Sequence, residues 1–485
     1  MMHQPFEWLK QRNQALLWVL LTGFFVLFVF SFYHRWVHMD DAWFADEALM
    51  MARTGQIRSE VFTGFLHYEH KVLNAHKLHV MLGALYIHAF GFSPWVLKAV
   101  PLPFLALLGL LLLHHQRRFT PCHGTGVLLL TLLLLLAHSS VFEYSYSYRP
   151  EMAHACLGFG SFLLLQRGVQ GNRYAPVAAA GVLAGLAAFI HLNGLTFIAA
   201  GGGVLFFRGA FRKMFLFGGI AAAVTALYFF DIRTPEDVQL FLFQFRNDPA
   251  LKANNFSPWH YFTKIFGEHM RLFRDWPQAS LTGLLLLVLL LTFPHLRRHN
   301  GFLLAYTLLL VLAVAVITRD TNIKYYILNI PFFVVIIAQG VAYQFTQPRP
   351  APRYVLAAAL TFYLAVHAVL DVRLVRRRED LVAIHERVAA VIPAGSAIIA
   401  PITFVFNQID RYDMRTLEVY RYQREKGTLT VPFWTYCRST GRQYAVLKGG
   451  ALTELHLSRE AVRAGGPHFE LVAELPDDYL VCRIK

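Results

Sequence analysis

Apolar runs separated by shorter polar stretches dominate the first 371 residues of the chain. Many of these runs are roughly 16 to 20 residues long, and a helix of that length crosses a hydrocarbon layer ~30 Å thick. We therefore predict eleven membrane-spanning helices, at residues 15–33, 94–113, 126–142, 152–166, 175–191, 194–207, 214–230, 278–294, 301–317, 325–343 and 354–371. The first run is interpreted as a retained anchor, because it lacks a small-residue cleavage site and ends in bulky aromatic residues.

Two long polar segments, residues 35–93 and 231–278, interrupt the spans and are predicted to lie on the same side of the membrane. Residues 76–90 of the first segment are apolar enough to suggest a further span. We place them instead in a helix on the outer membrane surface, since the stretch carries His76, Lys77, His79 and His88. A span at this place would also move every later basic loop to the outer side.

Charged residues are sorted by loop. With a cytoplasmic N-terminus, every inner loop is basic, as the positive-inside rule requires. The basic residues are Lys10, Arg12, Arg117, Arg118, Arg167, Arg173, Arg208, Arg212, Lys213, Arg297, Arg298, Arg349 and Arg353. Among the acidic residues, only Glu7 falls in an inner segment. The pattern predicts an integral protein of the plasma (inner) membrane that carries its acidic groups on the outer side.

The composition narrows the class of protein. Hydrophobic residues make up 56% of the 485 residues and charged residues 15%, which is more apolar surface than a soluble domain needs. The net charge of +15 is spread over loops, so nucleic-acid binding is not expected. None of the predicted spans has an acid near its centre, where ion-coupled transporters place ionisable residues. We expect an enzyme at the boundary between water and lipid.

After residue 373 the pattern changes to a charged helix at 376–391 and to short strand-like runs at 397–400, 443–447, 469–474 and 479–484. The chain is therefore divided into a transmembrane domain, residues 1–373, and a small soluble α/β domain, residues 374–485. An odd number of spans places this domain outside the cytoplasm. There Cys437 and Cys482 are either bridged or free thiols.

The first polar segment opens with acidic residues at the membrane surface. Asp40 and Asp41 follow the first span, and a short amphipathic helix ends at Gly55. Here the sequence resembles the large-loop membrane glycosyltransferases of family 39, which include the protein O-mannosyltransferases and the aminoarabinose transferase of lipid A. That family has an acidic pair after the first span and an amphipathic helix ending near Thr-Gly, where this chain has Asp40-Asp41 and Thr54-Gly55.

Further places along the membrane part carry the same resemblance. They are Ala75-His76-Lys77-Leu78 and Phe90-Gly91 at the ends of the surface helix, Arg149-Pro150-Glu151 before the fourth span, Asn193-Gly194 in an outer turn, and Lys324-Tyr325-Tyr326 before a late span. The two prolines that the family has at the start of the surface helix are absent here. The resemblance implies a GT-C type membrane glycosyltransferase that uses a polyprenyl-phosphate-linked sugar.

This chemistry needs few protein groups, because a sugar on polyprenyl phosphate already has a good leaving group. The protein has to deprotonate the acceptor hydroxyl and stabilise the departing phosphate. Our candidate catalytic residues are Asp40, Asp41 and Glu151. Asp40 is the first choice as general base, since burial at the lipid edge raises the pKa of a carboxyl group. Candidate ligands of the donor phosphate are Arg149, Lys71, Lys77, Arg319 and Lys324, and candidate substrate contacts are Tyr148, Asn193 and Tyr325.

Structural roles remain open for the same residues. Asp40 and Asp41 fit the N-cap of a helix, and Glu151 fits the first turn, where the helix dipole favours an acid. Basic residues such as Lys324 commonly reach toward water at a membrane interface without binding a ligand. Tyr148 belongs to an alternating run of tyrosines that is typical of an interfacial aromatic belt.

A metal site is a further alternative in the first polar segment. Histidines are dense around Glu69, and His76 and His79 share one face of the predicted surface helix, so these three residues suggest a divalent-metal site. Solvated surface histidines are the simpler explanation. The four cysteines form no CxxC pattern, and no other cofactor is expected.

Taken together, these features predict a glycosyltransferase that moves a single sugar from a polyprenyl-phosphate-linked donor to an acceptor hydroxyl at the outer face of the membrane, with inversion. The acceptor is a lipid, a glycan or a protein. The alternatives are a transporter or flippase of lipids or polysaccharides, and a non-enzymatic subunit of cell-envelope assembly.

Overall fold

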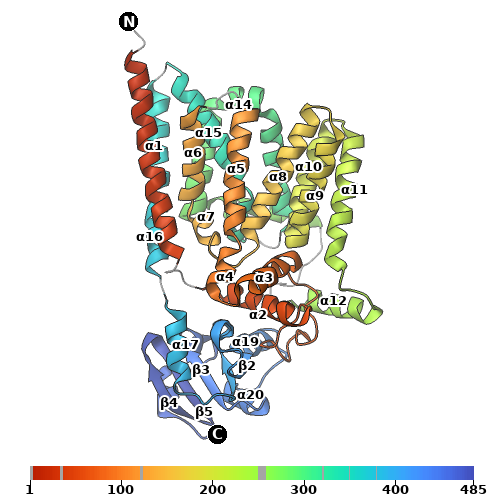
Figure 1. Cartoon of the computed structure of the whole chain (residues 1–485), viewed down its shortest axis with the longest axis vertical. Coiled ribbons are helices and arrows are strands. Elements are labelled where there is room, and N and C mark those ends of the chain that lie inside the picture. Colours follow the sequence, from red (N-terminus) through yellow and green to blue (C-terminus); the bar gives the residue numbers. More distant parts are fainter. Residues whose placement is uncertain are drawn as a thin grey trace.

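The computed structural model describes residues 4–32, 37–120, 124–248, 258–318, 322–348, 350–377 and 379–485. Figure 1 shows an upright helical bundle, a layer of short helices across one end of it, and a C-terminal α/β unit beyond that layer. We call the end of the bundle that carries the short helices the site end. The bundle helices are α1 (Gln4–Ser31), α5 (Leu102–Phe119), α6 (Thr125–Ala137), α8 (Glu151–Gln170), α9 (Tyr174–Ile190), α10 (Leu195–Phe207), α11 (Phe211–Ala226), α14 (Trp276–Ile317), α15 (Ile330–Thr346) and α16 (Pro350–Arg376).

The predicted spans coincide largely with these helices, but the start of the span 94–113 and the end of the span 126–142 fall in two short helices, α4 (Pro94–Ala99) and α7 (Ser139–Tyr144), at the site end. Each of the eleven is helical, with short breaks such as the one at Pro101 between α4 and α5. Within the described residues, five helical stretches are long and apolar enough to cross a membrane, and four shorter apolar helices accompany them. The chain is an integral membrane protein with a mostly helical fold, as the sequence predicts.

Two of the predicted spans are joined within α14. This helix runs for 42 residues, but Asn300 leaves helical geometry at φ −124° and ψ 25°. The hydroxyl of Tyr326, in η4 (Ile323–Leu328), donates to the carbonyl oxygen of Gln278 near the start of α14 at 3.2 Å. Arg271, in α13 (Pro258–Phe273), donates to the hydroxyl of Thr318 just beyond its end at 2.8 Å. Because α13 and η4 are in contact, both ends of α14 lie together, and its two halves form an antiparallel hairpin turned at Asn300.

Small residues let α9 pack closely against α11. A Cβ atom at Gly181 would come within 2.7 Å of the carbonyl oxygen of Phe217, and one at Gly185 within 2.7 Å of that of Ala221. Close backbone approach through glycines spaced four apart is a common way for membrane helices to associate. The contact between α9 and α11 therefore depends on glycine at positions 181 and 185, because a side chain there would meet the backbone of α11.

The layer at the site end consists of α2 (Met39–Thr54), α3 (Lys77–Phe90), α4, α7 and α12 (Pro235–Asn247). α13 packs against α14 and η4. α3 confirms the helix predicted over residues 76–90. α2 begins after His38, whose Nδ1 accepts the backbone N–H of Asp40 at 3.1 Å, while the carboxylate of Asp41 accepts the N–H of His38 at 2.9 Å. It ends at Gly55, whose φ of 72° suits a residue without a side chain.

The C-terminal unit is a five-stranded mixed sheet with the strand order β2-β1-β3-β5-β4. Its strands are β1 (Ala397–Ala400), β2 (Asp413–Thr416), β3 (Tyr444–Lys448), β4 (Phe469–Leu475) and β5 (Tyr479–Ile484), and its helices are α17 (Leu381–Ala389), α18 (Val405–Gln408), α19 (Leu417–Glu425), α20 (Phe433–Ser439), α21 (Gly449–Glu454) and α22 (Arg459–Ala464). β1 pairs in parallel with β2 and β3, whereas β5 is antiparallel to β3 and β4.

Two predictions for this unit are corrected, and the state of its two cysteines, bridged or free, is answered. The helix expected over 376–391 is wrong in its first turn, because α16 continues to Arg376 and a separate helix, α17, starts at Leu381. Strand β2 is absent from the prediction. Cys437 and Cys482 are both buried free cysteines.

The C-terminal unit packs directly on the layer of short helices. Arg53 of α2 makes two hydrogen bonds of 2.7 Å with the carboxylate of Asp410. The backbone N–H of Thr416 donates to the carbonyl oxygen of Val61 at 2.9 Å. Buried apolar residues of α2 and of the sheet belong to one continuous core. The packing of the sheet against α2 therefore fixes the position of this helix.

Candidate functional site

Arg149 lies at the centre of a group of charged side chains at the site end. It precedes Pro150, which fixes the start of α8, so Glu151 is the first residue of that helix. The guanidinium Nε of Arg149 donates to both carboxylate oxygens of Glu151 at 3.1 and 3.2 Å, and Nη2 donates to Oε1 at 2.5 Å. Both side chains are buried. A two-pronged contact of this kind fixes the plane of the guanidinium.

Asp40 also belongs to the charged group around Arg149. Its Oδ2 accepts a hydrogen bond from Nη1 of Arg149, and another from Nζ of Lys324 in η4 at 3.0 Å. Asp41, the next residue, accepts the backbone N–H of His38 instead, so the two neighbouring acids have different partners. Three segments that are far apart in the sequence therefore bring two carboxylates and two cations together.

The pKa of Asp40 differs from the sequence-based expectation. Burial raises this pKa, but the nearby charges of Arg149 and then Lys324 outweigh burial and hold it well below its usual value. Expecting burial to dominate was therefore wrong, because two cations contact the carboxylate. For Glu151 as well, burial raises the pKa and Arg149 lowers it below its usual range. Both carboxylates are ionised at neutral pH.

Asp41 behaves in the opposite way. Its pKa is raised to about 7 by complete burial, against the opposing charges of Lys98 and Arg149. Its carboxylate accepts the N–H of His38 and so caps α2. The structure thus supports the capping role of Asp41 and separates it from Asp40, which faces the cations.

Histidine rings extend the group beyond Glu151. The ring of His76 stacks on His191 at 4.2 Å between centroids, and Tyr325 meets His191 edge-on at 5.7 Å. The backbone N–H of Asn193 donates to Nδ1 of His191 at 3.0 Å. Two predicted substrate contacts, Asn193 and Tyr325, are therefore arranged around His191, which the sequence analysis missed. Its position, two residues before Asn193, was the available signal.

α13 adds a second charged pair that the sequence analysis did not single out. Arg271 is fully buried and donates from Nη1 to Glu268 at 3.0 Å, and its guanidinium carbon lies 6.0 Å from the ring centre of Tyr325. Burial raises the pKa of Glu268 to about 7 against the attraction of Arg271. The spacing of three residues on an amphipathic helix was the signal that could have indicated this pair.

Two of the predicted phosphate ligands are engaged elsewhere. Lys77 forms an ion pair with Asp231, and its Nζ lies 4.7 Å from the ring centre of Tyr228. Lys71 donates to Asp237 at 2.6 Å. These pairs join the polar segments 35–93 and 231–278, so Lys71 and Lys77 hold the two segments together in the structure.

Other predicted site residues have different surroundings. Tyr148 is fully buried, and its hydroxyl donates to the carbonyl oxygen of His79 at 3.1 Å, which supports a packing role and leaves no surface for a substrate. Arg319 lies outside the described residues.

The metal site predicted from Glu69, His76 and His79 is wrong as a three-residue cluster. Among the described residues, no group of three or more His, Cys, Asp and Glu side chains is arranged to hold a metal ion. Glu69 accepts the N–H of Gly64 at 3.2 Å. His76 and His79 instead stack on His191 and Tyr148. The three side chains are thus directed to different partners.

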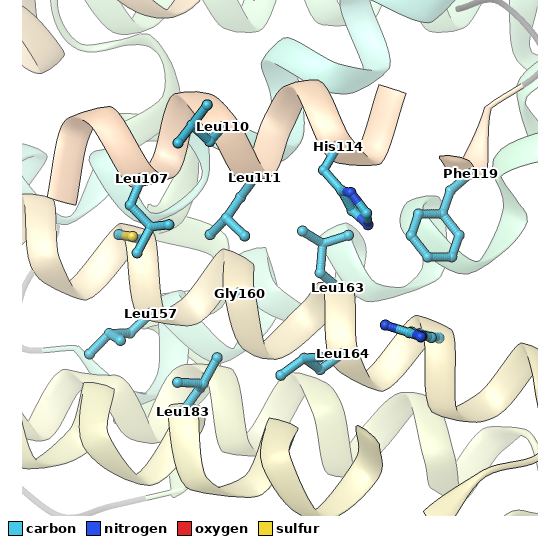
Figure 2. Close-up of a pocket in the computed structure, with 12 residues that line it drawn as sticks. Leu107, Leu110, Leu111, His114, Phe119, Leu157, Gly160, Leu163, Leu164 and Leu183 are labelled. Atoms are coloured by element: carbon cyan, nitrogen blue, oxygen red, sulfur yellow. The ribbon is translucent and has the colours of Figure 1, made fainter. Parts of the chain in front are cut away.

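A large apolar groove lies away from the charged group, among the bundle helices. It has a volume of about 470 Å³, and Figure 2 shows Leu107 and Leu111 of α5 facing Leu157 and Leu163 of α8 across it. Its lining is almost entirely apolar, with none of the carboxylates described above. His114 and Arg167 are the polar side chains that its lining includes. Carboxylates beside cations are found in the charged group at the site end, which is therefore the candidate site.

A helical bundle with surface helices at one end and a small mixed sheet beyond them is a GT-C-like fold, as the similarity to solved structures shows. The chain is similar to ArnT from Cupriavidus metallidurans, in the apo state (TM-score 0.64, 13% identity) and bound to undecaprenyl phosphate (TM-score 0.66, 14% identity), over 97% of this chain and 98% of that one. It is also similar to the Archaeoglobus fulgidus oligosaccharyltransferase in complex with Zn and sulfate (TM-score 0.55, 13% identity), over 93% of this chain and 71% of that chain. No protein-family model matches the chain, and no curated protein matches it in sequence.

Proposed function

We propose that this protein is a glycosyltransferase that moves one sugar from a polyprenyl-phosphate-linked donor to an acceptor hydroxyl at the membrane surface. The observation that carries the proposal is the group formed by Asp40, Arg149, Glu151 and Lys324. It places ionised carboxylates beside cations at the ends of membrane helices, where a lipid-borne phosphate and a water-borne hydroxyl can meet. The GT-C-like fold, shared with a chain solved with undecaprenyl phosphate, supports it.

In the proposed reaction, Asp40 takes the proton of the acceptor hydroxyl. The acceptor oxygen forms a bond to the anomeric carbon of the sugar. The bond from that carbon to the phosphate oxygen breaks, and its electron pair stays on the departing polyprenyl phosphate. A single displacement inverts the anomeric centre, and positioned carboxylates of this kind contribute roughly 10² to 10⁴ in rate.

Lys324 has a double role in this proposal. In the structure it pairs with Asp40 and is about one-third exposed, whereas Arg149 is almost wholly buried between two carboxylates. A donor phosphate draws the more exposed cation, so Nζ of Lys324 moves from Asp40 to the phosphate. Asp40 then loses one of the charges that lower its pKa, and it becomes a stronger base when the donor is bound.

The orientation belongs to the same proposal. Basic loops on the far side of the bundle favour a cytoplasmic N-terminus, with the site and the C-terminal sheet on the outer face of the plasma membrane. The acceptor is then a lipid, a glycan or a protein of the cell envelope.

The test uses purified protein in lipid nanodiscs with a panel of synthetic polyprenyl-phosphate sugars and an envelope extract as the source of acceptors. We expect one donor to yield free polyprenyl phosphate and a product that carries the sugar. The parallel experiment in sealed vesicles measures uptake of the same donors. Uptake of an intact donor without any transfer product would contradict the proposal and support a flippase.

A further inference from the structure

α12 exposes a stripe of apolar residues of the kind that a surface helix of a soluble protein buries. Two of its polar residues, Asp237 and Gln244, are buried, whereas Val238, Leu242 and Phe245, spaced at i, i+4 and i+7, are exposed. The exposed polar residues Gln239 and Arg246 lie beside this stripe. In an aqueous environment a surface helix shows the opposite arrangement. The exposed stripe therefore requires an apolar neighbour.

Specific hydrogen bonds fix this orientation of α12. The side chain of Gln244 accepts the backbone N–H of Leu73 at 2.8 Å and donates to the carbonyl oxygens of Leu66 at 3.0 Å and Lys71 at 2.6 Å. Asp237 accepts from Lys71 at 2.6 Å. Turning the helix to bury its apolar stripe would leave these buried polar groups without partners, which is costly.

α13 has the same inside-out arrangement. Glu268 and Arg271 are buried, and Lys264 donates to the carbonyl oxygen of Thr318 at 2.7 Å. Large apolar residues follow the opposite face at helical spacing, and Trp259 and Phe266 are 70% and 65% exposed. Among the described side chains, this exposed stripe includes Trp259, Phe262, Phe266, Met270 and Phe273.

We propose that the exposed faces of α12 and α13 lie in the membrane leaflet next to the site. Both helices are continuous with membrane helices, since α12 follows α11 through η3 (Leu227–Phe229), and α13 leads into α14 after two residues. Trp259 and the exposed Trp276 are typical of the interface between lipid and water. Amphipathic helices bind this zone with the apolar face buried ~5–10 Å deep.

The experiment places single cysteines, in a background without native cysteines, at Leu242 and Phe266 and labels them with a nitroxide. The protein is reconstituted in nanodiscs, and collisions with oxygen, which concentrates in lipid, are compared with those of a water-soluble nickel chelate. Leu290, an exposed apolar residue of α14, is the lipid control, and Glu425, exposed on α19, is the water control. The measurement needs no transfer reaction, so it is independent of the proposed function.

We expect labels at Leu242 and Phe266 to favour oxygen as the label at Leu290 does, with at least a several-fold preference over the label at Glu425. Collision with the nickel chelate as frequent as at Glu425 would overturn the proposal, because the faces would then lie in water. Protection from both reagents would also overturn it, since a second protein copy or a partner would then cover the stripe.

Discussion

At the scale of single residues, charge balance around Arg149 is the feature on which the site depends. Arg149 is buried with Glu151 and contacts Asp40, so it compensates carboxylates that cannot be solvated. Ion pairs of this kind contribute little relative to apolar replacements, but removing one partner leaves an uncompensated buried charge. Removing both partners should therefore cost less stability than the two single removals add up to.

We expect Arg149→Ala to lower the free energy of unfolding by about 3–5 kcal/mol, because Glu151 is left buried without a counter-charge. Arg149→Ala with Glu151→Ala should cost less than the sum of the two single changes. The measurement is unfolding in detergent micelles. Arg53→Ala is the control, since its pair with Asp410 is exposed and should contribute ~1 kcal/mol or less. Equal losses for Arg149→Ala and Arg53→Ala would contradict the charge-balance argument.

A second residue-scale prediction concerns pH. Burial, and then the charge of Asp46, raises the pKa of Glu47 to about 8 in the folded protein. A carboxyl group with a raised folded-state pKa stabilises the fold fully below its unfolded pKa of ~4.3, and this stabilisation is lost as the pH rises toward 8. The free energy of unfolding should therefore fall between pH 5 and pH 8, on the order of 1–3 kcal/mol from this group.

Glu47→Gln tests this titration, because the amide oxygen can still accept the hydrogen bond that Trp43 Nε1 donates to Glu47 at 2.8 Å. Chemical unfolding of the protein and of the variant is compared at pH 5 and pH 8. The variant should lose less stability over this range. Parallel losses in the two proteins would show that Glu47 does not titrate there.

Much of the candidate site could be identified from the sequence, because polar groups next to membrane helices are conspicuous. Asp40, Arg149, Glu151 and Lys324 stood out in this way, although Asp40 and Arg149 are 109 positions apart. The sequence does not tell which charged side chains contact one another. Composition cannot tell that Lys77 contacts Asp231 or that two cations reach Asp40, and these contacts decide the sign of a pKa shift.

At the scale of elements, the close packing of α9 against α11 can be tested by substituting glycines of the two helices. A side chain at Gly185 would collide with the carbonyl oxygen of Ala221 and with Val224, whereas a Cβ at Gly218 of α11 meets nothing within 4 Å. We expect Gly185→Leu to destabilise the protein in detergent strongly and Gly218→Leu to be tolerated, because only the first position lies between helices. Thermal unfolding of the two variants measures the difference. Similar melting temperatures would contradict the observed packing.

The elements were predicted unevenly, and for physical reasons. The length of an apolar run is a strong signal because the bilayer fixes it, so the spans were found. Strand β2 was missed because its sequence, Asp413–Thr416, is short and has no apolar alternation. α12 and α13 depart from the usual rule, since each buries two polar residues and exposes a stripe of large apolar ones. Composition alone does not tell which face of an amphipathic helix meets the protein.

At the scale of the whole molecule, the C-terminal sheet and the helical bundle hold the layer of short helices between them. α2 carries Asp40 at its first turn, and the opposite end of α2 is tied to the sheet through Arg53 and Asp410. Asp40 is thus positioned by contacts on both sides. A site of this kind requires the intact chain, and its activity should be measured on the full-length protein in lipid.

The central claim is that Asp40 takes the proton of the acceptor in sugar transfer. The most direct test compares the release of polyprenyl phosphate by the unaltered protein, by Asp40→Asn and by Glu60→Gln, with folding checked by thermal unfolding. Glu60 is an exposed acid of the same polar segment, paired with Arg58 at 2.7 Å. We predict that Asp40→Asn loses at least about a hundredfold in rate and that Glu60→Gln keeps the full rate. Full transfer by folded Asp40→Asn would contradict the account.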